Sequence, residues 1–262
     1  MGKLTDALKK AAEERLVRIE KLDSQGDVKY EFVAKKTVDS KIDPRIVSFY
    51  EPKSAVAEQY RMLRTNIQAI NSKNPIKVIT ITSSINGEGK TITAINLAIS
   101  MANDLNKKSI LLVDADLRRS RVSRYLGVNA ESGLADLIAN GINIDEVLIN
   151  IGIENLTILT AGKIPHNPAE ILGSAKMRNL IATLRAKYDY VILDSPPIIP
   201  VTDAGLIGAQ TDGIIMVIQA NRTQKGVVKH SRSLLAQVQA KILGYALTNI
   251  QYHIPQYIYR YL

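Results

Sequence analysis

A glycine-rich stretch in the first half of the chain constrains the fold most strongly. It reads Ser-Ser-Ile-Asn-Gly-Glu-Gly-Lys-Thr over residues 83–91. An apolar run precedes it at residues 77–82, and a segment with helical periodicity follows it. The stretch matches the phosphate-loop consensus GxxxxGK[ST] with one departure, since Ser84 stands at the first glycine position. It therefore predicts a strand–loop–helix unit that binds the phosphates of a nucleotide.

Each residue type in this loop has an expected role. Gly87 and Gly89 allow the backbone to turn so that successive N–H groups face the β-phosphate. The start of the following helix adds further free N–H groups and its dipole. Lys90 is expected to reach the β- and γ-phosphates, the Thr91 hydroxyl to bind Mg²⁺, and the Glu88 side chain to point away from them. The predicted nucleotide contacts in the loop are Asn86, Gly87, Glu88, Gly89, Lys90 and Thr91.

Strand and helix patterns alternate from residue 53 to about residue 250. Short runs rich in Val, Ile and Leu predict strands at 77–82, 109–114, 156–160, 190–194, 213–219 and 244–248. Helices are predicted at 91–103, 133–139, 174–184, 203–209 and 223–239. This alternation predicts an α/β fold with a doubly wound, mostly parallel sheet. In such a fold the ligand site lies at the carboxyl ends of the strands.

Two other predicted strands end in carboxylates. The run at 109–114 continues as Asp114-Ala-Asp116-Leu-Arg118, and the run at 190–194 ends in Asp194. A strand-terminal Asp alone is usually a cap or turn residue, but these lie at the sheet edge that carries the phosphate loop. Asp114 is favoured as the acceptor of a hydroxyl proton. The predicted catalytic residues are Lys90, Asp114, Asp116 and Arg118. The predicted Mg²⁺ ligands are Thr91, Asp116 and Asp194.

The two ends of the chain differ in texture from this domain. Residues 1–52 are highly charged, with an apolar stripe at helical spacing (Leu4, Leu8, Ala11, Ala12) and a linker bracketed by Pro44 and Pro52. Residues 251–262 are expected to form an exposed tail. This tail carries four of the eleven tyrosines, Tyr252, Tyr257, Tyr259 and Tyr261. The sequence therefore predicts an arm at 1–52, an ATP-binding domain at 53–250 and a tyrosine-rich tail at 251–262.

Charge and residue counts narrow the functional classes. The formal net charge is +9, and from residue 213 to the end the chain has no Asp or Glu. A solvated basic face, nucleic acid, an anionic membrane surface or an acidic protein site could each account for this segment. Cysteine is absent and the three histidines lack metal-ligand spacing, so a zinc enzyme is not expected. No apolar run approaches the ~20 residues of a membrane span and the charged start fits no signal peptide, so a cytoplasmic location is expected.

Taken together, these motifs resemble those of the bacterial tyrosine kinases of capsule and exopolysaccharide synthesis, the BY-kinases, over about residues 55–250. The phosphate loop is similar to the Walker A element of that family, and the run through Asp114, Asp116 and Arg118 to its Walker A′ element. Residues 188–204 (YDYVILDSPPIIPVTDA) resemble its Walker B segment, and residues 162–172 (GKIPHNPAEIL) a recurring loop. The resemblance implies a P-loop nucleotidase that binds ATP and Mg²⁺, with Asn249 as an adenine contact.

The resemblance also implies how the protein acts and with whom. Glu58-x-x-Arg61-x-x-Arg64 matches the motif by which subunits of the family interlock into rings, although such spacing alone is typical of a solvated helix face. Each subunit would offer its four tail tyrosines to the active site of a neighbour. The autokinase would regulate polysaccharide polymerisation and export. Its implied partners are a membrane-embedded chain-length (polysaccharide co-polymerase) activator that recruits it to the inner face of the membrane and an opposing tyrosine phosphatase, with no nucleic acid.

Two other functions stay open at the level of sequence. The first is a non-kinase ATPase switch that controls assembly of a membrane partner, like the division-site and plasmid-partition ATPases. Those proteins carry a signature lysine where this chain has Ile85. The second is an interaction module in which ATP only orders the fold. A GTPase is disfavoured because no Asn-Lys-x-Asp motif occurs.

Overall fold

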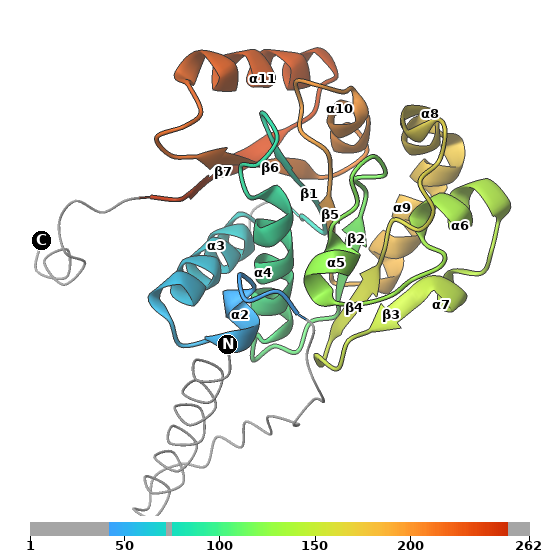
Figure 1. Cartoon of the computed structure of the whole chain (residues 1–262), viewed down its shortest axis with the longest axis horizontal. Coiled ribbons are helices and arrows are strands. Elements are labelled where there is room, and N and C mark those ends of the chain that lie inside the picture. The colour runs from blue at the N-terminus through green and yellow to red at the C-terminus, as the bar shows by residue number, and fades with distance from the viewer. Residues whose placement is uncertain (1–41, 72–74, 251–262) are drawn as a thin grey trace, which may run out of the picture. The chain divides into compact units, whose positions relative to one another are not determined.

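A single seven-stranded sheet forms the centre of the protein (Figure 1). The computed structural model describes residues 42–71 and 75–250, so the predicted N-terminal helix and the tyrosine tail lie outside the described residues. The strands are β1 (Val78–Ser83), β2 (Ile110–Asp114), β3 (Leu148–Asn150), β4 (Leu156–Leu159), β5 (Tyr190–Asp194), β6 (Gly213–Gln219) and β7 (Ile242–Thr248). Their order is β3-β4-β2-β5-β1-β6-β7, and only the β3–β4 pair is antiparallel. The predicted doubly wound, mostly parallel α/β fold is confirmed.

Helices cover both faces of this sheet. They are α2 (Val47–Tyr50), α3 (Ala55–Asn71), α4 (Lys90–Ala102), α5 (Val122–Leu126), α6 (Leu134–Asn140), α7 (Ile144–Val147), α8 (Pro168–Gly173), α9 (Ala175–Lys187), α10 (Asp203–Gly208) and α11 (Lys225–Gln237). Side chains of α3, α4 and α5 form the core on one face, and those of α6, α8 and α9 the core on the other. A third cluster packs α10 and α11 against β6. Every residue of β1, β2 and β5 is buried as a result, which explains their continuous apolar sequences.

The register of the central strands brings the carboxyl ends of three strands to one edge of the sheet. β5 lies between β2 and β1, with Asp114 paired to Asp194 and Ile81 paired to Asp194 across the two ladders. Because the three strands are parallel, their carboxyl ends lie side by side at the same edge of the sheet. The segments that follow β1, β2 and β5 therefore meet there.

Short elements account for most of the differences from the prediction. β3 has three residues, and α2, α5, α7 and α8 have six or fewer, which is too short for a periodic pattern to be recognised. α3 was foreseen only as a possible helix face around the Glu58 motif. The five predicted helices are present with ends shifted by at most three residues. Among the residues that the structure describes, no helix combines the length and the apolar character needed to cross a bilayer.

Residues 42–52, which the proline pattern places in a linker, pack against the domain. Ile42 and Ile46 are buried in the core cluster that contains α4. The Ser48 backbone N–H donates to the Asn96 side-chain oxygen at 2.8 Å, and the Asn96 amide donates to the Arg45 carbonyl at 3.2 Å. Among the described residues, the packing of the domain therefore extends back to Ile42. Ile42 and Ile46 form an apolar pair at the helical spacing i and i+4, which predicts a buried face, whereas Pro44 and Pro52 predict a linker.

Candidate active site

The phosphate loop lies between β1 and α4, as predicted. Gly87 and Gly89 have φ angles of +84° and +95°, in the left-handed region that other residues adopt at a cost. Gly89 is the residue that caps α4, so the free N–H groups of the first helical turn open onto the loop. This is the backbone geometry of an anion-binding cradle at a helix start.

Glu88 anchors this loop from behind. Its side chain is only 1% exposed and points toward the end of β6. It accepts hydrogen bonds from the Ile85 backbone N–H (2.7 Å), the Gln219 backbone N–H (3.4 Å) and the Thr223 hydroxyl. On the other side of the loop, the Thr248 hydroxyl donates to the Glu88 carbonyl at 2.7 Å. Glu88 thus turns away from the cradle, as expected, and ties the loop to the ends of β6 and β7.

Lys90 lies among the carboxylates that follow β2 and β5. Its Nζ is 2.7 Å from an Asp116 oxygen and 3.6 Å from an Asp194 oxygen, and all three side chains are buried. Burial alone would lower the pKa of Lys90, but the charges of Asp194 and Asp116 outweigh burial and raise it. Lys90 therefore stays charged. Three residues predicted to act at one site lie together, although they are up to 104 positions apart in the chain.

Asp114 is fully buried next to this cluster. Burial, followed by the charge of Asp194, raises the pKa of Asp114 to about 8. One of its oxygens accepts from the backbone N–H groups of Arg121 and Val122, both at 3.1 Å, and the other from that of Asp116 at 3.2 Å. It therefore also fixes the start of α5, a structural role that sequence reasoning did not assign.

Asp194 is the group that fits a metal ion. Burial raises its pKa, although the nearby Lys90 and Thr91 side chains act against this shift. Both of its carboxylate oxygens are inaccessible, and Lys90 Nζ, 3.6 Å from one of them, lies too far away for a well-formed hydrogen bond. A buried carboxylate without hydrogen bonds is costly unless a ligand or cation satisfies it. No group of three or more His, Cys, Asp or Glu residues within 42–71 and 75–250 has metal-ligand geometry. The predicted ligands Thr91, Asp116 and Asp194 offer oxygen donors, the kind that Mg²⁺ prefers, and Mg²⁺ at such a site usually also takes oxygens from substrate phosphates.

Arg118 is held by a residue that the sequence did not single out. Its guanidinium donates two hydrogen bonds to Asp203, from Nε at 2.8 Å and from Nη2 at 3.0 Å. The Asp203 side chain is fully buried and the Arg118 side chain is 39% exposed. The nearby charge of Asp116 helps to raise the pKa of Arg118, after its bond to Asp203. Asp203 lies in the segment that follows Asp194 and β5. This closeness in sequence to Asp194 is the only feature that could have indicated a place for Asp203 near the site.

An arginine to which the sequence assigned no role in the site lies on the phosphate loop. Arg222 donates to the Asn86 carbonyl at 3.0 Å and to the Gln219 side-chain oxygen at 2.8 Å. A Cβ atom at Gly87 would lie 2.9 Å from its guanidinium, which the flexible Arg222 side chain could relieve by a small shift, so the φ of +84° is the stronger reason for glycine at this position. Asn249 lies at the same edge, directly after Thr248, with a φ of +53°. No local pattern in the sequence distinguishes Arg222 from the other cations of its segment.

The predicted assembly residues lie elsewhere, on α3. Glu58 and Arg61 form an ion pair with each other, and Arg61 also donates to the Pro52 carbonyl. Arg64 donates to the Ser100 carbonyl of α4 at 2.7 Å. All three side chains are therefore engaged within their own chain.

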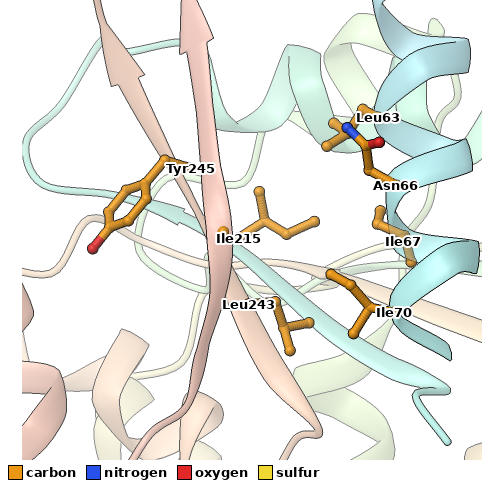
Figure 2. Close-up of a pocket in the computed structure, with 8 residues that line it drawn as sticks. Leu63, Asn66, Ile67, Ile70, Ile215, Leu243 and Tyr245 are labelled. Carbon is orange, nitrogen blue, oxygen red and sulfur yellow. The ribbon is translucent and has the colours of Figure 1, made fainter. Parts of the chain in front are cut away.

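A separate cavity of about 210 Å³ lies between α3 and the β6–β7 edge. Figure 2 shows Leu63, Ile67 and Ile70 of α3 pointing toward Ile215 and Leu243. Its lining is apolar apart from Asn66 and Tyr245, and Tyr245 points away from α3. It shares no residue with the phosphate loop or the carboxylate cluster, so we do not assign it to the active site.

Comparisons with known proteins agree with this geometry. A family model described as an AAA domain matches residues 76–243. The chain is 37% identical to the tyrosine-protein kinase YwqD of Bacillus subtilis (strain 168), over 80% of this chain and 88% of that protein. Among solved structures, the chimerical protein CapA2B2 is similar at a TM-score of 0.75 and 32% identity, covering 80% of this chain and 93% of the other. The kinase domain of the Escherichia coli tyrosine kinase ETK has a TM-score of 0.75 at 25% identity and covers 89% of both chains.

Proposed function

This chain belongs to the family of bacterial tyrosine-protein kinases with an AAA domain, and from that premise we propose that it is an autokinase. It transfers the γ-phosphoryl group of ATP to tyrosines of its own C-terminal segment, Tyr252, Tyr257, Tyr259 and Tyr261. The observation that carries the proposal is the position of Lys90, buried with Asp116 and Asp194 at the end of the phosphate loop. A lysine and carboxylates at this place serve phosphoryl transfer in P-loop enzymes.

The residues divide the work of binding. The N–H groups of residues 86–91 hold the β-phosphate. When ATP binds, the Lys90 ammonium group moves away from Asp116 and Asp194 and contacts the β- and γ-phosphates. Thr91, Asp116 and Asp194 are the residues that would hold Mg²⁺, which neutralises charge on the phosphate oxygens when bound. Asn249 contacts the adenine at the end of β7.

The transfer forms one bond to the γ-phosphorus and breaks another. The tyrosine oxygen forms a bond to the γ-phosphorus, the bond from that phosphorus to the bridging oxygen breaks, and ADP leaves. The tyrosine proton passes to a carboxylate, for which we propose the ionised form of Asp114. Its pKa of about 8 makes this form a strong proton acceptor, although it is the minor form at neutral pH unless a bound cation lowers the pKa. Arg118, held by Asp203 near Asp116, stabilises charge on the transferred group.

Assembly and regulation follow from the tail. Subunits form a ring through Glu58, Arg61 and Arg64, and each tail enters the site of a neighbour. Each phosphotyrosine carries about −1.5 to −2 charge, so four offset the six Lys and Arg residues between Gly213 and the end of the chain. Phosphorylation would then weaken docking of the tail and loosen the ring, and a tyrosine phosphatase would restore it.

The cellular role that we propose is control of capsule or exopolysaccharide polymerisation and export. A membrane-embedded chain-length protein would activate the kinase and recruit it to the inner face of the membrane from the cytoplasm. The similarity to the chimerical protein CapA2B2 supports a partner that acts next to the kinase domain.

Intact-mass analysis after incubation with Mg-ATP tests this function. We expect up to four added phosphates on the unmodified protein and none on Lys90→Met. A variant with the four tail tyrosines changed to Phe should lose most of the added mass, whereas Tyr245→Phe, at an exposed tyrosine of the domain, should lose none. ATP hydrolysis without protein phosphorylation would refute the autokinase. Unchanged phosphorylation of the four-tyrosine variant would refute the tail as acceptor.

A further inference from the structure

Three cations form a stripe along one side of α11. Lys225, Lys229 and Arg232 are spaced at i, i+4 and i+7, which places them within an arc of about 60° on a helix of 3.6 residues per turn. All three side chains are exposed. The opposite side of the helix, with Ser231 and Leu235, is buried against the sheet. In Figure 1 α11 lies on the outside of the protein, next to α10 and beside β6 and β7.

These cations are distinguished by their grouping on one side of a helix. Some exposed Arg and Lys residues elsewhere pair with acids, as in Arg45–Asp43, Lys107–Glu154 and Lys187–Asp145, whereas others, such as Lys53 and Lys163, form no ion pair within the described residues. Within residues 42–71 and 75–250, no carboxylate lies within ion-pair distance of the three cations on α11, or of Lys241 just after it. The nearest acids in sequence are before residue 213. The stripe is therefore a concentrated, uncompensated positive field.

Apolar side chains project from the same face of the sheet beside this helix. Ala246 packs into the core on the α4 face, so its neighbours Tyr245 and Leu247 point to the face that α11 covers. Tyr245 is 47% exposed and Leu247 58% exposed, because β7 is the edge strand and α11 does not reach over them. A tyrosine and a leucine beside unpaired cations are typical of a surface that lies at a lipid headgroup layer.

We propose that α11 and the adjacent β7 edge form a docking surface for an anionic lipid bilayer. Lys225, Lys229, Arg232 and Lys241 contact the headgroup phosphates, and Tyr245 and Leu247 reach the interface between headgroups and acyl chains. The surface is additional to any membrane partner. It is also independent of the proposed kinase activity, since lipid binding needs no ATP.

The observations favour lipid over nucleic acid. The stripe lies on the convex surface of a helix, and Tyr245, the exposed tyrosine beside it, is next to the apolar Leu247 and not in a row of aromatic rings on which successive bases could stack. A cluster of Lys and Arg on a helix, each worth on the order of 1 kcal/mol near an anionic membrane, is sufficient for salt-dependent surface binding.

Vesicle co-sedimentation of the full chain without nucleotide tests the proposal. The probe is vesicles of equal parts phosphatidylglycerol and phosphatidylcholine, compared with pure phosphatidylcholine. The triple variant K225Q/K229Q/R232Q should reduce partitioning to the anionic vesicles about 100-fold. The matched control K53Q/K107Q/K163Q removes the same net charge from exposed lysines outside α11 and should change it less than about threefold. Tyr245→Ser with Leu247→Ser should weaken binding further, at a salt concentration that suppresses the electrostatic part.

Each outcome decides the proposal. Selective loss of binding to anionic vesicles in the α11 variant, with an unchanged thermal melting curve, supports it. An equal loss of vesicle binding in both triple variants would show that net charge alone drives binding and would overturn the proposal. Equal binding of the unmodified protein to anionic and to pure phosphatidylcholine vesicles would also overturn it. Tighter binding to duplex DNA than to anionic vesicles, lost in the same α11 variant, would replace the lipid surface with a nucleic-acid site.

Discussion

The guanidinium of Arg118 is bound edge-on to the buried carboxylate of Asp203 by two hydrogen bonds, although 85 residues separate them. Two parallel charge-assisted bonds fix both the position and the plane of a guanidinium. This pair joins the loop after β2 to the segment after β5. Asp203 thus sets the direction in which Arg118 faces the candidate site, although Asp203 is not itself one of the predicted site residues.

Asp203→Asn should therefore impair phosphoryl transfer more than nucleotide binding. The substitution keeps the shape of the side chain but replaces one charged acceptor with a donor, so Arg118 is no longer held by two bonds. A displacement of about 1 Å at a charge-stabilising group can cost on the order of 100-fold in rate. We expect a loss of about that size in autophosphorylation rate, with the ATP dissociation constant from calorimetry changed less than about threefold.

A second Arg–Asp pair in the same chain gives the control. Arg45 and Asp43 also form two hydrogen bonds, at 2.9 and 2.8 Å, but on the surface and away from the site. Asp43→Asn should leave the rate unchanged. If Asp203→Asn lowered ATP affinity and rate together, Asp203 would be a general structural residue and not one that positions Arg118.

The contacts that sequence reasoning missed share one physical cause. The phosphate loop, the apolar strands and their terminal carboxylates are local patterns, and parallel strands necessarily bring their carboxyl ends together. The long-range partners of Arg118 and Glu88 come from segments 85 to 160 positions away. Their identity depends on how closely two loops approach, which no periodicity encodes. The packing of Ile42 and Ile46 on α4 is a different case, because their spacing at i and i+4 is a local pattern that could have indicated it.

Removing the charge of Asp114 should change how stability depends on pH. Burial and the charge of Asp194 raise the pKa of Asp114 from 3.8 to about 8, so ionisation of this carboxyl opposes folding. Its stabilising protonated form is complete below the unfolded pKa and is lost as pH rises toward 8. The unfolding free energy of the nucleotide-free protein should thus decline between about pH 5 and pH 8, with a slope of up to about 1.4 kcal/mol per pH unit for one proton.

Urea unfolding at intervals across this range measures the effect. Asp114→Asn should flatten the decline, because the amide does not titrate. Asp145→Asn, at an exposed carboxylate, should leave the profile parallel to that of the unmodified protein. A profile for Asp114→Asn that also stayed parallel would show that another group carries the pH dependence.

The anchor behind the phosphate loop should be needed for nucleotide binding. Glu88→Gln turns an acceptor of three hydrogen bonds into a side chain with one acceptor and one donor group, so at least one buried partner loses its bond. We expect a loss of about 1–3 kcal/mol in unfolding free energy. The loop would also be less well held, so ATP affinity should fall about tenfold. Calorimetry and urea unfolding measure the two quantities.

Single-contact variants separate the two sides of the anchor. Thr223→Val removes the bond to the Glu88 side chain, and Thr248→Val removes the bond to its carbonyl. Each should show part of the effect. Glu146→Gln, at an exposed acid on α7, should show none. Unaltered ATP affinity in Glu88→Gln would mean that the loop keeps its shape without this anchor.

The Glu58–Arg61 pair should matter for assembly and not for the fold. The two side chains pair with each other on the exposed face of α3, and an exposed pair of this kind contributes only about 0–1 kcal/mol to stability. A variant with both residues changed to Ala should therefore melt within a few degrees of the unmodified protein. If α3 forms the ring interface, the same variant should appear as a monomer by light scattering after size-exclusion chromatography, under conditions in which the unmodified protein forms larger species. Changing the exposed pair Lys107 and Glu154 to Ala removes an equivalent pair from another surface and should leave the assembly intact. A ring that persisted without Glu58 and Arg61 would place the subunit interface on a different face.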